Sequence, residues 1–518
     1  MHGLSWLDIG LMGAYFGLVT IIGIASARAV STQGDFYVGG RRLGKFLTIM
    51  MSFGVGTSNT HPILVSGAVY KLGMPGIWYS WLYMLFMPAQ WVLEPLIRRL
   101  RIYTTADYFE LRYSKGLGPC FSLSAMFNIG IMIGTMLIGM GQIVEGITAG
   151  GLTSDVVIVL AAVVIVLYGT AGGLLAAALT DVLQGFLVIL LSFMLLPPMF
   201  NAVGGLEGLH AALPAERFSL AMPRGGDPSQ SIGVFAIFML FINGVMGSLI
   251  EPQAQTKQAS KDEWTLRIGV LIGTFLKRLC TVAWALVGLC AVVIWPSLDN
   301  AETCFGLATR EYLPSGFSGL MIAAMMAAAM STCDALMVSG SAIFSRNLYA
   351  RYIHKSATDR HYLTVARCVG VLLVGAGLII AFWLGSVIEA VELWWKVTAF
   401  IGPTLLLGMF FRRGNSWGAW ACVIVSATVW ALTQYDVIVS SADLRWDTVW
   451  YQAALYLPAG IAAYFMVSLL TLPENGAKLD RFFARLNTPV GEEEALIATG
   501  LEPHPEEIMA SRPGTAQA

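Results

Sequence analysis

The chain has 518 residues, of which 56% are hydrophobic and only 12% are charged. Soluble domains carry about 25% charged and roughly 45–50% apolar residues, so this composition excludes an ordinary soluble protein. The 31 lysines and arginines nearly balance the 32 aspartates and glutamates. The chain therefore lacks the basic excess that binding to a nucleic-acid backbone requires.

Thirteen apolar segments are long enough to cross a bilayer, because about 20 helical residues span its hydrocarbon core. They lie near residues 5–27, 47–70, 76–97, 119–146, 153–170, 174–197, 232–250, 267–295, 316–345, 364–385, 387–411, 416–436 and 450–472. We therefore predict an all-α polytopic membrane protein. A transmembrane domain covers residues 1–472, and the polar residues 473–518 are expected to form a flexible cytoplasmic tail.

The basic residues predict the orientation of these spans. Most lysines and arginines fall in alternate connections, such as residues 41–45, 98–101 and 346–367, and in the tail. Since cytoplasmic loops carry the excess of basic residues, we place the N-terminus outside and the C-terminus in the cytoplasm of a cell (plasma or inner) membrane. An odd number of spans requires the same arrangement.

Two of the predicted spans are interrupted by glycines and polar residues. The second contains the run Ser52 to Pro62, with two glycines, several hydroxyls and a proline. The seventh contains the run Phe241 to Ser248, followed by Glu251 to Gln253. Lipid cannot satisfy a broken backbone, so such stretches are tolerated only where they are buried or line a cavity. Interrupted helices in matching positions of two halves are typical of inverted-repeat transporters. The alternative is two kinked helices in another polytopic protein.

The ninth span carries consecutive hydroxyls at Ser331 and Thr332, one turn after Ala328. Two hydroxyl oxygens and the Ala328 carbonyl could bind a hard cation, which needs several oxygens at once. The alternative is that these hydroxyls bond the carbonyl four residues earlier or contact a neighbouring helix.

Four ordered motifs between about residues 5 and 470 make the chain resemble the sodium:solute symporter family, which includes sodium/glucose, sodium/proline and sodium/sialic acid transporters. They are Asp35 to Arg41, Tyr103 to Tyr113, Tyr168 to Leu174 with Thr180 to Gln184, and Ala328 to Thr332. The resemblance implies a LeuT-type fold of about 13 transmembrane helices. Spans two to six and seven to eleven would be its five-plus-five inverted repeat.

The resemblance also implies a sodium site between spans two and nine. Its ligands would be the Ala328 carbonyl, the Ser331 and Thr332 hydroxyls, two carbonyls at Gly54 and Thr57, and Asp181 nearby on span six. A register shifted by one residue would place the carbonyls at Val55 and Ser58. Unlike the proline transporters, this chain has no carboxylate in the broken second span, which leaves the sodium stoichiometry and the identity of the ion open.

The family lines its solute site from spans two, three, seven and eleven. By position this nominates Asn59, Thr60, His61, Trp78, Tyr79, Trp81, Asn243, Glu251, Trp395 and Lys396. Aromatic residues at this density suit an apolar pocket with a few converging polar groups. A sugar or an amino acid would fit equally well.

Charged residues inside spans are functional candidates, because each is costly to insert into lipid. Lys396 is four residues after Glu392 and could either pair with it or face a substrate carboxylate. One of Lys277 and Arg278 could pair with an acidic residue while the other reaches the solute.

Together these features predict a sodium-coupled symporter that imports a small polar organic solute, a sugar, amino acid or carboxylate, by alternating access. Proton coupling, a channel and a solute sensor are the alternatives. An enzyme is not expected, because no HExxH, GxSxG or paired-carboxylate motif stands in a cavity context. The expected partners are sodium, the solute and the lipid bilayer, with no nucleic acid and no cofactor besides the ion. The chain is expected to be a monomer or weak oligomer.

Overall fold

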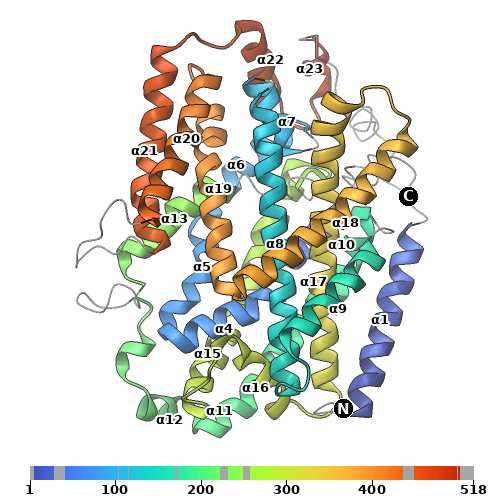
Figure 1. The fold of residues 1–518 in the computed structure, drawn as a ribbon, viewed down its shortest axis with the longest axis vertical. Coiled ribbons are helices and arrows are strands. Elements are labelled where there is room, and N and C mark those ends of the chain that lie inside the picture. The colour runs from blue at the N-terminus through green and yellow to red at the C-terminus, as the bar shows by residue number, and fades with distance from the viewer. Residues whose placement is uncertain are drawn as a thin grey trace.

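The computed structural model describes residues 5–27, 41, 43–102, 104–114, 116–169, 173–221, 232–248, 257–435, 448–498 and 500–501. In these ranges the chain is helical throughout its regular elements, with one isolated bridge between Leu43 and Ser260. The predicted all-α architecture is therefore confirmed. Figure 1 shows most helices running roughly along the long axis, with α9 and α18 crossing obliquely.

The first six predicted spans coincide with helices. They are α1 (Trp6–Ala27), the pair α3 (Lys45–Gly56) and α4 (Thr60–Leu72), the pair α5 (Trp78–Leu85) and α6 (Met87–Arg99), α8 (Leu117–Thr148), α9 (Ser154–Gly169) and α10 (Gly173–Met194). Short elements connect them: η2 (Met74–Ile77), α7 (Thr105–Arg112), α11 (Leu196–Val203), α12 (Gly205–Ala212) and η3 (Ala215–Phe218).

The remaining seven spans coincide with α13 (Val234–Ser248), α15 (Glu263–Ile294), α17 (Phe317–Ala342), α18 (Asp359–Leu384), α19 (Val387–Phe410), α20 (Ser416–Gln434) and α21 (Val449–Leu470). Between and after them lie η4 (Ala301–Thr303), α16 (Cys304–Tyr312), the π-helical η5 (Ile343–Ile353), α22 (Gly476–Asn487) and α23 (Glu493–Ala498). Eight described helices are long and apolar enough to cross a membrane in one piece. The second and third spans fall short because each is divided into two helices.

The break in the second span follows from its local sequence. α3 ends at Gly56, where the Thr57 amide donates to the Gly54 carbonyl, and α4 begins at Thr60. Pro62 occupies the first turn of α4, where a helix tolerates proline because the missing N–H has no helical partner there. The predicted interruption in the seventh span is wrong over residues 241–248, because α13 runs through these residues as continuous helix. Its second part, Glu251 to Gln253, lies among residues 249–256, outside the described chain.

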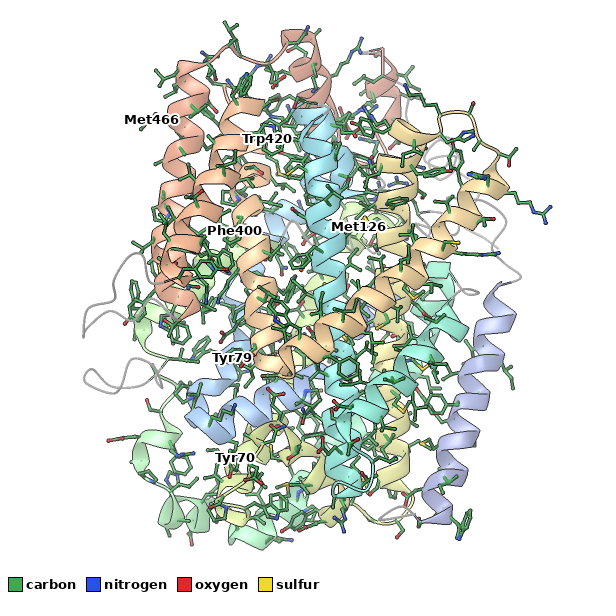
Figure 2. All side chains as sticks on the ribbon, in the orientation of Figure 1. Tyr70, Tyr79, Met126, Phe400, Trp420 and Met466 are labelled. Atoms are coloured by element: carbon green, nitrogen blue, oxygen red, sulfur yellow. The ribbon has the colours of Figure 1, made fainter. Side chains whose placement is uncertain are left out.

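The two ends of the bundle carry different connections (Figure 1). One end, the α22 end, carries α7, α22 and α23, and the opposite end, the α12 end, carries α11, α12 and α16. At the α12 end Glu302 accepts hydrogen bonds from the Ser386 hydroxyl (2.7 Å) and the Val387 amide (2.9 Å), and so fixes the start of α19. An acidic side chain is favourable at this position because a helix N-terminus is partially positive. Buried apolar side chains pack between the helices and form one large core cluster (Figure 2).

Residues 476–498 differ from the predicted flexible tail, because they form α22 and α23 and contact the bundle. Arg101, buried after α6, donates to the Thr488 carbonyl (3.2 Å), the Pro489 carbonyl (2.9 Å) and the Glu493 carboxylate (3.0 Å). Phe482 packs edge-on against Tyr108, with ring centroids 5.5 Å apart. The sequence does not predict this contact, because the two members of the ion pair lie far apart in the chain. Residues 473–518 alone show only a polar composition, which is typical of a flexible tail.

We expect Arg101→Met to detach residues 476–498, because it removes three hydrogen bonds and leaves the buried Glu493 carboxylate without its cation. Breaking a buried ion pair costs about 3–5 kcal/mol. Limited proteolysis of the purified protein should then cut this segment at much lower protease concentrations than in the wild type.

Arg412→Met is the matched control, since Arg412 pairs with Asp480 while both side chains are more than half exposed. Exposed ion pairs contribute only about 0–1 kcal/mol, so cleavage should resemble that of the wild type. Equal protection of both variants would contradict a role for Arg101 in holding the tail.

Candidate functional site

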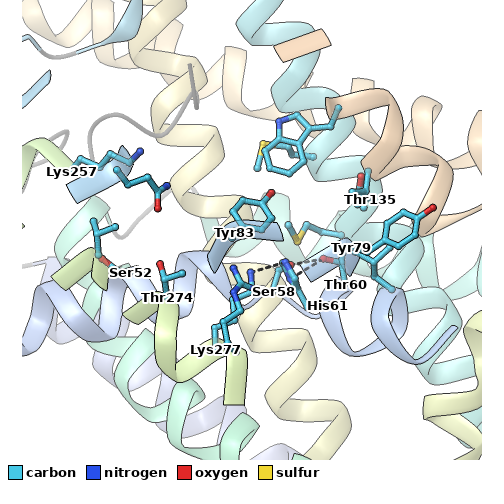
Figure 3. Close-up of a pocket in the computed structure, with 18 of the residues that line it drawn as sticks. Ser52, Ser58, Thr60, His61, Tyr79, Tyr83, Thr135, Lys257, Thr274 and Lys277 are labelled. Carbon is cyan, nitrogen blue, oxygen red and sulfur yellow. Dashed lines mark hydrogen bonds between the residues drawn. The ribbon is translucent and has the colours of Figure 1, made fainter. Parts of the chain in front are cut away.

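A cavity of about 150 Å³ surrounds the break between α3 and α4 (Figure 3). Side chains from α3, α4, α5, α6, α8, α15 and α19 line it. They are Thr48, Ser52, Ser58, Thr60, His61, Leu64, Tyr79, Tyr83, Gln90, Met132, Thr135, Met136, Lys257, Leu266, Val270, Thr274, Lys277, Arg278, Val391 and Trp394. Eleven of these side chains are serine, threonine, glutamine, histidine or basic residues, and nine are aromatic or aliphatic. Such a mixed lining can bind a small organic molecule that carries polar groups.

The cavity extends from this break toward the α22 end. Thr48 and Leu266 lie in the first turns of α3 and α15, and both line the cavity. The start of α15 lies at the α22 end. This is shown by Glu263 in its first turn, which accepts a hydrogen bond from the amide of Val490, just before α23 (3.0 Å). The cavity therefore reaches from the centre of the bundle toward that end.

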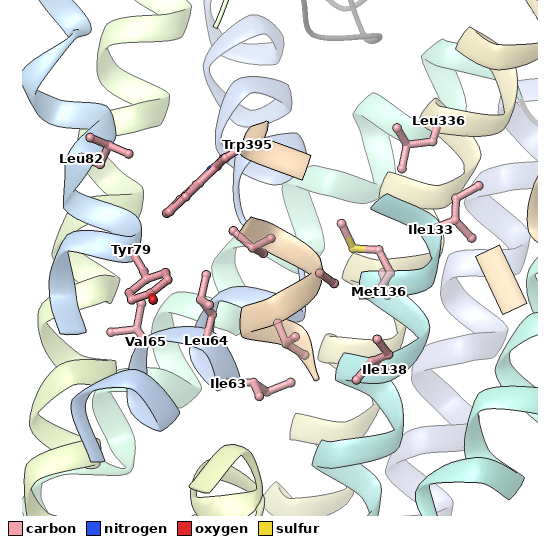
Figure 4. Close-up of a cluster of buried hydrophobic side chains, with 14 of the residues drawn as sticks. Ile63, Leu64, Val65, Tyr79, Leu82, Ile133, Met136, Ile138, Leu336 and Trp395 are labelled. Carbon is pink, nitrogen blue, oxygen red and sulfur yellow. The ribbon is translucent and has the colours of Figure 1, made fainter. Parts of the chain in front are cut away.

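Aromatic side chains close the cavity toward the α12 end. Tyr79 donates a hydrogen bond to the Glu392 carboxylate (2.6 Å) and stacks on Trp395, with ring centroids 5.6 Å apart at 21°. Figure 4 shows Tyr79 close to Leu64 and Val65 of α4 in the buried cluster. The stacked rings and the aliphatic packing close this side of the site.

His61 links the helix break to α15 (Figure 3). Its Nε2 lies 2.7 Å from the Lys277 ammonium, and its Nδ1 lies 3.1 Å from the Ser58 hydroxyl, which is 2.5 Å from the Thr60 hydroxyl. An ammonium group can only donate, so Nε2 accepts and the ring proton belongs on Nδ1, where it faces Ser58. This chain of hydrogen bonds holds the first turn of α4 to the middle of α15.

Arg278 is the second buried cation on α15. Its guanidinium donates to the Ser80 hydroxyl (2.6 Å) and lies over the Tyr83 ring, 5.0 Å from the centroid. Ser80 in turn lies 3.2 Å from the Thr281 hydroxyl. These contacts hold Arg278 against α5 while it lines the cavity.

Among the predicted solute ligands, Thr60, His61 and Tyr79 line the cavity. Asn59 lies at the break but donates to the Met136 carbonyl (2.9 Å), so it ties the break to α8. Trp78 lies apart from the cavity, since its indole donates to the Leu220 carbonyl (2.7 Å), and Trp81 packs edge-on against it.

The predicted ligands on the seventh and eleventh spans occupy different positions. Asn243 and Trp395 line a smaller space of about 20 Å³, to which Tyr83 and Trp394 also contribute. The Asn243 amide lies 3.5 Å from the Trp395 carbonyl and accepts from the Tyr456 hydroxyl (2.8 Å). Lys396 interacts electrostatically with Glu392, and Glu251 lies outside the described residues.

The predicted cation ligands lie on packed helices. α17 contacts both α3 and α10. The Ser331 and Thr332 hydroxyls are buried and point back to the Ala328 carbonyl, at 3.3 and 2.8 Å. Gly54 and Thr57 lie at the end of α3, and the buried Thr57 hydroxyl has no hydrogen-bond partner among the described residues. Asp181 lies on α10, but its side chain is outside the described part of the structure.

Several lining residues were not predicted as solute ligands. For Lys277 and Arg278, two adjacent cations in mid-span are a signal that the sequence does give, and it allows one of them to reach the solute; in the structure both line the cavity. Thr135 and Met136 give no such signal, because α8 runs without interruption past the cavity. Tyr83 and Trp394 are ordinary aromatic residues in the sequence, and only the packing of α5 and α19 brings them to the cavity.

The geometry defines a class of protein: a polytopic membrane transporter with a central cavity at broken helices. A sequence profile described as the sodium:solute symporter family matches residues 36–426. The chain therefore belongs to the sodium:solute symporter family, and it is a sodium-coupled transporter and not an enzyme.

Characterised relatives cover most of the chain. The sodium/pantothenate symporter of Escherichia coli (strain K12) is 26% identical over 439 residues, which cover 81% of this chain and 89% of the relative. The sodium/glucose cotransporter of Vibrio parahaemolyticus is 24% identical over 474 residues, covering 82% and 84%. The osmoregulated proline transporter OpuE of Bacillus subtilis (strain 168) is 26% identical over 446 residues, covering 82% and 88%.

Solved structures confirm the LeuT-type fold. A sodium-coupled sialic acid symporter in a substrate-bound outward-open state superposes with a TM-score of 0.73 at 18% identity, covering 90% of this chain and 98% of that structure. The nucleobase-cation-symport transporter Mhp1 in a closed conformation superposes with a TM-score of 0.55 at 11% identity, covering 88% and 99%.

The close approach of α13 and α19 beside the smaller space depends on Gly402. A methyl group at this position would lie 2.0 Å from the Met246 carbonyl oxygen, which is backbone and cannot rotate away. We expect Gly402→Ala to destabilise the protein by about 1–3 kcal/mol, as overpacking does. The measurement is the melting temperature of the purified protein.

Gly375→Ala on α18 is the control, because a methyl group there meets nothing within 4 Å. Alanine is the better helix former by about 1 kcal/mol, so this variant should melt at or above the wild-type temperature. A melting temperature of Gly402→Ala at or above that of the wild type would contradict the close packing of α13 against α19.

Proposed function

We propose that this protein imports a small polar organic solute together with sodium by alternating access, through the cavity at the α3–α4 break. The observation that carries the proposal is the position of the cavity. It lies at the break between α3 and α4, where the backbone is not helical. Broken helices at mid-membrane are where transporters of this architecture bind solute and ion. In the cell, the α22 end would face the cytoplasm, because it carries most of the basic residues.

The arrangement corresponds to an inward-facing state under this orientation. The cavity extends toward the α22 end, while Tyr79, Trp395 and Glu392 seal the other side. An outward-facing state would require this aromatic seal to open and the α22 side to close. Sodium drives the cycle to the extent that it binds one of the two states more tightly than the other.

We propose that the sodium site is formed by the Ala328 carbonyl and the Ser331 and Thr332 hydroxyls on α17, together with the carbonyls of Gly54 and Thr57 at the end of α3. Burial of both hydroxyls and the unpartnered Thr57 hydroxyl support this assignment. The C-terminus of α3 is also partially negative, which favours a cation there. Asp181 on α10 is the proposed acidic group near the ion.

We expect the double variant Ser331→Ala, Thr332→Ala to lose sodium-dependent uptake while remaining folded. Two of the proposed oxygen ligands disappear, and each 1.4 kcal/mol of lost ion binding lowers the affinity tenfold. Uptake into proteoliposomes at low sodium should fall by about tenfold or more. Uptake that depends on sodium as in the wild type would overturn the site.

Ser341→Ala is the matched control on the same helix. The Ser341 hydroxyl donates to the Ala366 carbonyl on α18 (2.7 Å) and lies well beyond the proposed site. Its sodium dependence should stay unchanged. Uptake by the wild type that follows a proton gradient in the absence of sodium would instead support the proton-coupled alternative, for which His61 in the cavity would be the candidate group.

The proposed orientation has its own test. A green fluorescent protein fused after residue 518 should fluoresce, because it folds in the cytoplasm, and alkaline phosphatase fused at the same position should be inactive. The reverse pattern would place the α22 end outside and turn the proposed inward-facing state into an outward-facing one.

A further inference from the structure

The charged side chains that line the cavity are all basic among the described residues. Three cationic side chains line it, Lys257, Lys277 and Arg278, and among the described residues no aspartate or glutamate does. In a membrane interior each buried charge is costly unless a counter-charge accompanies it. The distribution of these cations therefore bears on the kind of solute that the cavity receives.

The cation nearest the α22 end already has its counter-charge. The Lys257 ammonium lies 2.6 Å from the Glu94 carboxylate, in an ion pair that is largely buried. This pair contributes little net charge to the cavity. Lys277 and Arg278 lie deeper, on consecutive positions of α15 beside the helix break, and both are only 4% exposed.

Arg278 makes its described contacts with neutral groups. Its guanidinium donates to the Ser80 hydroxyl and lies over the Tyr83 ring, and its Nε is buried without a hydrogen-bond partner among the described residues. A guanidinium has five N–H donors and matches a carboxylate in two-point geometry. Arg278 thus retains donors for an acceptor that enters the cavity.

The first turn of α4 adds positive potential at the same place. Thr60 and His61 begin this 13-residue helix and line the cavity. A helix N-terminus is equivalent to about half a positive charge and favours an anion. The His61 imidazole, which accepts from Lys277, directs the ammonium toward the break.

We propose that the transported solute is a small organic anion, whose carboxylate binds between Arg278 and the Lys277–His61 pair. Its body would pack against the rings of Tyr79, Tyr83 and Trp394. A zwitterionic amino acid fits less well, because its ammonium group would find no carboxylate in the described lining. A neutral sugar would give the buried Arg278 guanidinium no anionic acceptor. This inference rests on the proposed symport function and specifies its substrate class.

The test uses full-length protein in detergent and three pools of compounds, each with sodium or with choline. The pools are short monocarboxylates from acetate to octanoate with their hydroxy and keto derivatives, neutral hexoses and polyols, and zwitterionic amino acids. We expect the monocarboxylate pool to raise the melting temperature in sodium. The corresponding carboxamides, which match in shape but carry no charge, should have no effect.

Single variants then locate the anion. Arg278→Gln should weaken the binding of the most effective carboxylate about 10- to 100-fold, as expected for a lost charge-assisted hydrogen bond. Arg278→Lys should recover part of that loss, because it restores the charge without the two-point geometry. Arg267→Gln is the control, because Arg267 lies about three turns earlier on α15 and outside the cavity lining. This variant should bind the carboxylate as tightly as the wild type does.

Folding and sodium binding are checked separately in each variant by the rise in melting temperature with sodium alone. A sodium-dependent shift with the sugar or amino-acid pool, none with the monocarboxylate pool, or wild-type carboxylate affinity in Arg278→Gln would overturn the anionic substrate class. These results leave sodium coupling intact. Absence of any sodium effect in the wild type would instead refute the proposed function itself.

Discussion

The structure depends on one constraint: a backbone broken inside the membrane must find hydrogen-bond partners within the protein. Between Gly56 and Thr60 the helical hydrogen bonds stop. The Asn59 side chain ties this segment to the Met136 carbonyl on α8, and Ser58 bonds with His61, which Lys277 of α15 contacts. The polar groups that surround the cavity are therefore also the groups that make the break tolerable.

The two sides of the cavity are closed by different kinds of interaction. Toward the α12 end the closing contact is mainly aromatic, with the stacked Tyr79 and Trp395 and the Tyr79–Glu392 hydrogen bond. Toward the α22 end the contacts are polar, such as the Lys257–Glu94 ion pair and the hydrogen bond from Arg41 to Gln258 (2.8 Å). Water can replace polar contacts at modest cost, whereas separating packed rings exposes apolar area. The described state is accordingly stabilised with its α12 side shut.

The sequence predicts those features of the structure that depend on neighbouring residues, and not those that depend on contacts between distant parts of the chain. The spans follow from composition and helix length, and the break follows from Gly54, Gly56 and Pro62, because these signals are local. The partners of a polar group are not local. Trp78 looked like a solute ligand by position, yet its indole faces the Leu220 carbonyl, while Thr135 on the uninterrupted α8 reaches the cavity without any mark in the sequence.

The break also offers a physical route to coupling between an ion and a solute. The C-terminus of α3 is partially negative and the N-terminus of α4 partially positive, and the two ends meet at residues 57–59. A cation at the first and a carboxylate at the second would each be stabilised by its own helix end and by the other ligand. Removing either ligand leaves the other facing an uncompensated charge in a low-dielectric interior. Two ligands of opposite sign at one break would therefore bind cooperatively with no signal carried over a distance.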